Sequence, residues 1–92
     1  MELEEAEKLL KNVDGWKLVH GTIEKSYKLD NFMQAVEFIN KVADAAEAEN
    51  HHPDILLWNW NNVKLTLTTH QAGGLSKKYF AFASKIDKIK RQ

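Results

Sequence analysis

Three of the four histidines in this sequence are placed where they could act on one small molecule. His51 and His52 are adjacent, directly before Pro53, and His70 ends a later run of alternating residues. Glu47 lies four residues before His51, one helical turn earlier, where a carboxylate can orient an imidazole and raise its pKa. Because imidazoles have pKa values of about 6.5, this cluster predicts a site for general acid and base catalysis.

Two other interpretations of these histidines remain open. They could be loop residues beyond a helix end, one of them a cation near the last carbonyl groups, favourable by roughly 0.3–1 kcal/mol. They could also bind zinc, which accepts imidazole ligands, but adjacent histidines in an extended segment point apart and cannot easily chelate together. We therefore expect no metal. His20 is far from the others in the sequence and is interpreted as a surface residue.

The composition argues against several other classes of function. The chain has no cysteine, which excludes disulfides, thiolate catalysis and cysteine-bound zinc. Its 13 basic and 13 acidic residues cancel, so its net charge favours neither nucleic acid nor anionic membranes as a partner. No apolar run approaches the ~20 residues of a membrane span, and the acidic start is unlike a signal peptide. We expect a single domain over residues 1–92, located in the cytoplasm.

Hydrophobic periodicity predicts the elements that must position the histidines. Apolar residues at helical spacing predict helices over about residues 2–12, 32–50 and 76–90, and alternation predicts strands over about 16–20, 23–29, 55–60 and 63–70. Asp30 or Asn31 can cap the middle helix, and Pro53 stops it. The order α-β-β-α-β-β-α predicts an α+β fold, a four-stranded antiparallel sheet with three helices packed on one face. A hairpin turn at Asn61-Asn62 would bring His52 and His70 close together.

The same spacing gives the middle helix an apolar stripe, and it gives the strand over residues 55–60 two apolar faces. The stripe consists of Phe32, Ala35, Val36, Ile39, Val42, Ala43 and Ala46. In the strand, Leu56, Trp58 and Trp60 would face the side of the sheet without helices. Another subunit or a bound ligand would have to cover them, so we expect an oligomer, at least a dimer.

One pattern of residues extends over nearly the whole chain. It consists of Glu47, His51-His52-Pro53, Trp60 and His70, flanked by Gly15-Trp16, Asn31-Phe32, Ala35, Phe38, Val42-Ala43, Asn62, Gly74-Leu75-Ser76, Ala83 and Asp87. This pattern resembles the pterin-4a-carbinolamine dehydratases. The resemblance implies the fold predicted above, a homodimer or homotetramer, and no metal or organic cofactor. It implies dehydration of 4a-hydroxytetrahydropterin to quinonoid dihydropterin, which recycles the cofactor of aromatic amino acid hydroxylases. Animal members also bind a transcription factor, so that partner is implied by analogy alone.

The resemblance also implies roles for the site residues. Loss of hydroxide from C4a of the pterin requires a proton on the leaving oxygen, while a base removes the proton from N5. Each proton transfer can contribute ~10²–10⁴ in rate. By resemblance, His51 and His70 are the candidates for the acid and the base, in an order that the sequence leaves open, and His52 completes the catalytic set by positioning the pterin. Glu47 would orient a histidine or contact the pterin ring, and the remaining residues that bind substrate would be Asn50, Pro53, Trp60, Thr68 and Thr69.

One position departs from the family pattern. Members commonly have an acidic residue nine positions after the last histidine, where this sequence has Tyr79. Asp87 lies eight residues further on, ~12 Å along a helix at 1.5 Å per residue, and is no simple substitute. A second hypothesis is therefore a pterin-binding or protein-dimerisation module whose catalysis is weak or lost because Tyr79 replaces the carboxylate.

Overall fold

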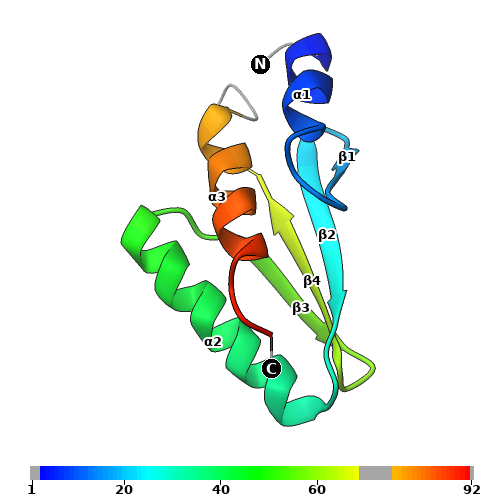
Figure 1. The fold of residues 1–92 in the computed structure, drawn as a ribbon, viewed down its shortest axis with the longest axis vertical. Helices are drawn as coiled ribbons and strands as arrows, with labels where there is room; N and C mark the ends of the chain where they lie inside the picture. Colours follow the sequence, from blue (N-terminus) through cyan, green and yellow to red (C-terminus); the bar gives the residue numbers. More distant parts are fainter. Residues whose placement is uncertain (1–2, 69–75, 92) are drawn as a thin grey trace.

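The computed structural model describes residues 3–68 and 76–91, which form three helices and four strands. In chain order they are α1 (Leu3–Leu10), β1 (Lys17–Val19), β2 (Thr22–Lys28), α2 (Phe32–Glu49), β3 (Asp54–Trp58), β4 (Asn62–Leu67) and α3 (Lys77–Asp87) (Figure 1). The strands form one antiparallel sheet in the order β1-β2-β4-β3, so β3 is an edge strand. The predicted α+β fold and element order are confirmed.

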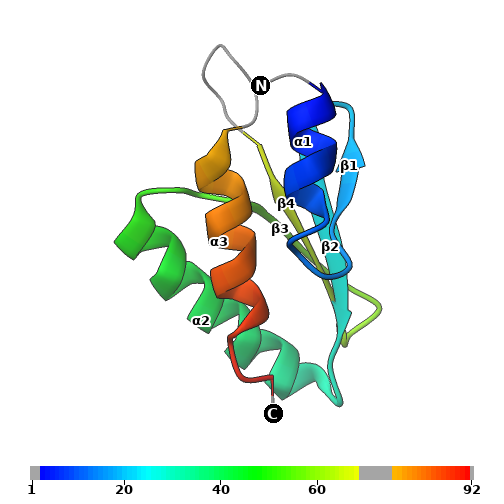
Figure 2. The same cartoon turned by 45° about the horizontal axis from the view of Figure 1, so that its top comes forward.

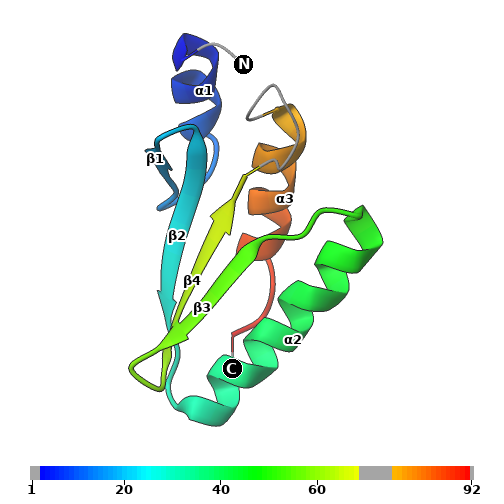
Figure 3. The ribbon, with the colours of Figure 1, turned by 180° about the vertical axis from the view of Figure 1, so that it is seen from behind.

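The helices cover one face of the sheet, and no described helix covers the other face (Figures 2 and 3). Strand β4 shows why: Val63, Leu65 and Leu67 are fully buried, while Lys64 and Thr66 between them are only half-buried. Successive side chains of a strand point to opposite faces, so this alternation buries one face. Each large apolar side chain buried there contributes about 1.5–3 kcal/mol. The helices add Ala35, Phe38, Val42 and Ala46 from α2 and Tyr79, Phe80, Phe82, Ala83 and Ile86 from α3.

Helix α2 begins and ends at recognisable caps. Asn31 has extended backbone angles, and its side-chain Oδ1 accepts a hydrogen bond from the Gln34 backbone N–H at 2.8 Å, as predicted for an N-cap. At the other end, Asn50 is left-handed (φ 49°, ψ 46°), and the His51 N–H donates to the Ala46 carbonyl at 2.9 Å. This is the Schellman arrangement, in which the chain turns sharply and satisfies the last carbonyl groups.

The predicted apolar stripe of α2 is wrong at two positions. Phe32 and Ala43 are exposed, whereas Phe38, which was left out of the stripe, is almost completely buried. The ring of Phe38 lies 4.8 Å from that of Tyr27 on β2, so contact with the sheet rotates the helix toward Phe38.

The predicted turn of the second hairpin is also wrong. Trp58 pairs with Asn62, so the turn lies at residues 59–61, and Asn59 and Trp60 take left-handed angles (φ 47° and 59°). The reason is a contact made by Asn61, which is buried and donates from its side-chain amide to the Leu29 carbonyl at 2.8 Å. Asn61 therefore ties the hairpin to the segment before α2, and Trp60 leaves the strand.

Candidate active site

The turn after α2 sends the two adjacent histidines in different directions. His51 is half-buried against α3, with its ring centroid 4.1 Å from that of Tyr79 at an interplanar angle of 71° and 5.0 Å from that of Phe82. His52 is exposed, and its Nε2 donates to Glu47 Oε2 at 2.5 Å. The expectation that Glu47 would orient His51 is wrong, because the left-handed Asn50 turns His52 toward this carboxylate.

The electrostatic surroundings of His51 favour its neutral form. Burial lowers the pKa of His51, and electrostatic interaction with His52 and Lys78 lowers it further, while Glu49 acts in the opposite direction. Among the described residues, no hydrogen-bond partner is found for its buried Nε2. An imidazolium would need an acceptor there, and leaving a buried donor unsatisfied costs about 1–3 kcal/mol. The predicted rise in the pKa of His51 is therefore wrong, because its surroundings lower this pKa and favour the neutral imidazole.

The remaining predicted site residues are spread over both ends of β3. Asn50 forms the cap of α2, and Pro53 is half-buried beside the histidines. Thr68 directly follows β4, whose register places Asp54 opposite Thr66. Trp60 is exposed in the turn at the far end of β3, roughly 15 Å away along a strand of this length. The predictions for Thr69 and His70 fall outside the described residues.

Three residues that sequence reasoning did not assign to the site contact or affect His51: Tyr79, Phe82 and Lys78. Helical spacing in the sequence puts Tyr79 and Phe82 on the apolar side of the predicted helix over residues 76–90, and the family pattern marks Tyr79 as a departure. The contact with His51 could not be predicted from either signal, because it depends on how α3 lies beside the end of α2. Lys78 gave no signal at all.

Asp87 is bound by three side chains from the first hairpin region. Its carboxylate accepts from Tyr27 OH at 2.6 Å, Lys25 Nζ at 2.8 Å and Trp16 Nε1 at 3.2 Å. Burial, and then the hydrogen bond to Asp87, raise the pKa of the Tyr27 phenol. This aspartate therefore anchors α3 to β2 and to the segment before β1. It does not replace the missing carboxylate at position 79.

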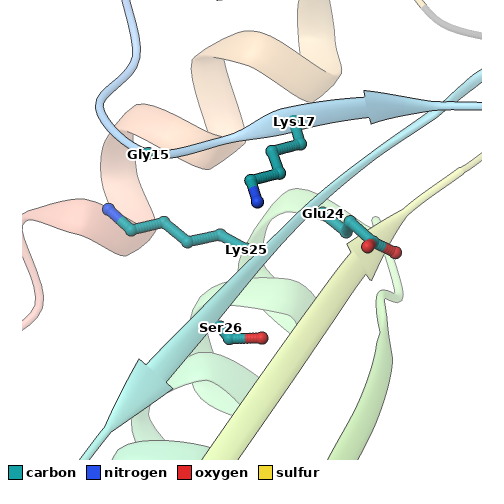
Figure 4. Close-up of a pocket in the computed structure, with 5 residues that line it drawn as sticks. All are labelled: Gly15, Lys17, Glu24, Lys25 and Ser26. Atoms are coloured by element: carbon teal, nitrogen blue, oxygen red, sulfur yellow. The ribbon is translucent and has the colours of Figure 1, made fainter.

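A polar hollow lies apart from the histidines, at β1 and β2. It has a volume of about 210 Å³ and is lined by Gly15, Lys17, Glu24, Lys25 and Ser26 (Figure 4). Lys25 extends from it toward the end of α3, where it binds Asp87. Gly15 lies so close to this side chain that a Cβ there would be 3.1 Å from the Lys25 Cε. The hollow contains no imidazole and offers no proton-transfer pair.

Within residues 3–68 and 76–91, no three His, Cys, Asp or Glu side chains converge as metal ligands would. His70 is not part of that range, so a site that included it is not covered by this statement. None of the described helices is long and apolar enough to cross a bilayer.

Comparison with known proteins places this arrangement in one family. The family model described as pterin 4 alpha carbinolamine dehydratase matches residues 1–89. A Chloroflexus aurantiacus relative named for this dehydratase is 48% identical over 88 residues, covering 96% of this chain and 92% of that protein. The pterin-4-alpha-carbinolamine dehydratase 2, mitochondrial, of Arabidopsis thaliana is 40% identical over 88 residues, 91% of this chain and 47% of that longer protein. The crystal structure of a Brucella melitensis transcriptional coactivator/pterin dehydratase is similar at a TM-score of 0.86 and 31% identity, over 95% of this chain and 94% of that one. The chain belongs to the pterin-4-alpha-carbinolamine dehydratase family.

Proposed function

We propose that this protein dehydrates 4a-hydroxytetrahydropterin to quinonoid dihydropterin by histidine acid and base catalysis. One observation carries the proposal: two adjacent imidazoles at the end of α2 have contrasting environments. His51 is half-buried and neutral, and His52 is exposed and hydrogen-bonded to Glu47. Neighbouring titratable groups in different environments are what a reaction with one proton donor and one proton acceptor requires.

The reaction needs two proton transfers and no redox step. The C4a–O bond breaks as a protonated donor delivers a proton to the leaving hydroxyl group, which departs as water. A base takes the proton from N5, and the electron pair of the N5–H bond forms the N5–C4a double bond. We propose His51 as a base, since its neutral ring can accept the N5 proton. His52 is exposed enough to contact the pterin, with Glu47 holding its ring in place.

His70 is proposed as the third imidazole, on the strength of its place in the family pattern. As the partner of a neutral His51, it would deliver the proton to the leaving oxygen. We propose Asn50, Pro53, Thr68 and Thr69 as the surrounding contacts to the pterin. Trp60 is proposed as a substrate contact only through association of chains, because it lies at the far end of β3 from His52.

The test is the rate at which 4a-hydroxytetrahydropterin disappears, with and without the protein. His51→Asn, His52→Asn and His70→Asn should each lower the rate at least ~10-fold, a threshold set below the ~10²–10⁴ that one proton transfer can contribute. The matched control is His20→Asn, which replaces the exposed histidine of the first hairpin turn and tolerates its left-handed backbone (φ 46°). Rates that stay unchanged in all three site variants would refute the assignment.

A second candidate function is a pterin-binding module with little catalysis. The observation that favours it is the buried ring of Tyr79 against His51, at the position where the family commonly has an acidic residue. Pterin binding, measured by fluorescence titration, with no acceleration of dehydration would support it. A large gain in turnover in Tyr79→Asp would also favour this function, whereas a wild-type rate that already exceeds the background rate strongly would exclude it.

We also propose that the chain forms at least a dimer through β3. This edge strand has exposed Leu56 and Trp58 on the face without helices, and exposed Trp60 follows in the turn. Apolar side chains grouped at a sheet edge commonly mark an interface. Light scattering at micromolar concentration should give at least twice the mass of one chain, and Trp58→Lys should shift the distribution toward the monomer. A wild-type monomer would contradict the proposal.

A further inference from the structure

Tyr79 and Phe82 of α3 form an aromatic seat against which the His51 imidazole packs. The Tyr79 ring meets the imidazole in an edge-to-face arrangement at 4.1 Å, and the Phe82 ring lies tilted at 5.0 Å. Tyr79 and Phe82 are both buried, with 9% and 2% of their surface exposed, so their positions are fixed by the core. Two rings three residues apart on one helix therefore fix where this imidazole lies.

The two carboxylates in the last turn of α2 are both engaged by other side chains. Glu47 accepts from His52, and Glu49 forms an ion pair with Lys85 of α3. The charged groups that act on His51 are His52 from the junction after α2, Lys78 from α3 and Glu49 from α2. Two of these three disfavour a proton on His51, and the third is already paired with Lys85.

We propose that Tyr79 is the positioning residue for His51: its ring occupies the place of the family carboxylate and holds the imidazole neutral and oriented to accept the N5 proton. This inference rests on the proposed dehydration for the role of the proton acceptor. The seat itself rests on the geometry alone. Tyr79 acts through His51 and needs no contact with the pterin.

The consequence is a specific dependence of activity on pH. A base works only when it is unprotonated, so the acid limb of the rate profile follows the pKa of His51. Burial in the aromatic seat lowers this pKa, and the rate should therefore persist to a lower pH than an ordinary imidazole, with its pKa of about 6.5, would allow. A carboxylate at position 79 would favour the imidazolium and move the acid limb to higher pH.

The experiment compares four variants of the full chain by NMR titration of the His51 imidazole and by the pH profile of dehydration. Tyr79→Phe keeps the ring, Tyr79→Leu removes it but stays apolar, and Tyr79→Asp introduces the carboxylate. Ala81→Asp is the matched control, because it adds the same charge to an exposed position two residues along the same helix. Tyr79→Leu also keeps the test decisive if Tyr79→Asp does not fold.

In Tyr79→Phe, we expect the lowered pKa of His51 and the acid limb to stay in place. In Tyr79→Asp, the pKa of His51 and the pH of the acid limb should both rise. In Ala81→Asp, both values should match those of the wild type. In Tyr79→Leu, the pKa should return toward the ordinary value, and kcat should fall by roughly 10-fold or more, since a misplacement of about 1 Å can cost ~10²-fold.

The proposal is overturned if wild-type His51 titrates as an ordinary imidazole, or if Tyr79→Asp and Ala81→Asp give the same titration. The titration needs no substrate, so its failure is distinct from failure of the proposed function. A chain that titrates as expected but does not accelerate dehydration would overturn the proton-acceptor role and leave the seat supported.

Discussion

Replacing Asp87 with alanine should destabilise the fold severely without touching the histidines. The carboxylate is the common acceptor for Trp16 Nε1, Lys25 Nζ and Tyr27 OH, and it lies on the last turn of α3. These donors come from the segment before β1 and from β2, so one side chain connects three parts of the chain. Asp87→Ala removes all of these hydrogen bonds at once.

The size of the stability loss in Asp87→Ala depends on whether each donor can find another acceptor. Trp16 and Tyr27 are buried, so their donors lose their acceptor where water has little access, and a buried unsatisfied donor costs about 1–3 kcal/mol. Lys25 loses less, because it also donates to the Asp14 carbonyl at 2.6 Å. The side chains of Lys25 and Asp87 are 15% and 20% exposed, so water can partly replace the broken contacts. We therefore expect a loss of about 3–4 kcal/mol, a large part of the ~5–15 kcal/mol that stabilises a typical domain.

Urea unfolding followed by tryptophan fluorescence measures this loss. With a slope of about 1–1.5 kcal/mol per M for a small domain, the midpoint should fall by roughly 2–4 M. Asp87→Asn, which has the same shape but keeps only one acceptor oxygen, should lose about half as much, since that oxygen can still accept from Tyr27 and Lys25 whereas the amide NH2 cannot accept from Trp16. The control is Asp44→Ala on the exposed face of α2, expected to change stability by less than about 0.5 kcal/mol. An Asp87→Ala protein no less stable than Asp44→Ala would refute the anchoring role.

Three further outcomes are expected from urea unfolding of other variants and at other pH values. Burial raises the pKa of Tyr27, so stability should be fully present below the ordinary phenol pKa of about 10 and fall as pH rises above it, and Tyr27→Phe should flatten this alkaline loss. Burial lowers the pKa of His51, so stability should be full above pH ~6.5. It should fall as the pH drops from there toward the lowered pKa, because acid protonates the unfolded chain before the folded one. His51→Phe should reduce this loss, and His20→Asn should leave it unchanged. Asn61→Ala should cost about 1–3 kcal/mol, because it removes a buried side-chain hydrogen bond, whereas the exposed Asn40→Ala should cost much less.

The element order could be predicted from the sequence because each signal is local. Alternation in β4, the cap at Asn31 and the stop at Pro53 each act over a few residues. The predictions from the sequence were wrong where a contact between residues far apart in the chain determined the local structure. The rotation of α2 toward Phe38 depends on Tyr27, and the position of the second turn depends on the hydrogen bond of Asn61 to a carbonyl before α2.

The same distinction applies to the candidate site. The sequence indicated His51, His52 and Glu47 as one group, because a helix that ends before a proline must bring them together. It could not indicate which histidine Glu47 would bind, since a helical spacing of four residues suggested His51. The left-handed Asn50 reverses this, because it turns one imidazole toward the carboxylate and the other toward α3.

The sequence by itself therefore determined the residue types of this site and the elements that present them, through periodicity, capping and one proline. Only the tertiary structure decided that the pKa of His51 is lowered. That property depends on Tyr79 and Phe82, which lie about thirty residues further along the chain and meet the imidazole only when α3 packs beside the end of α2. Burial and the charges of neighbouring elements set a pKa, and neither is encoded within the few residues around the histidine.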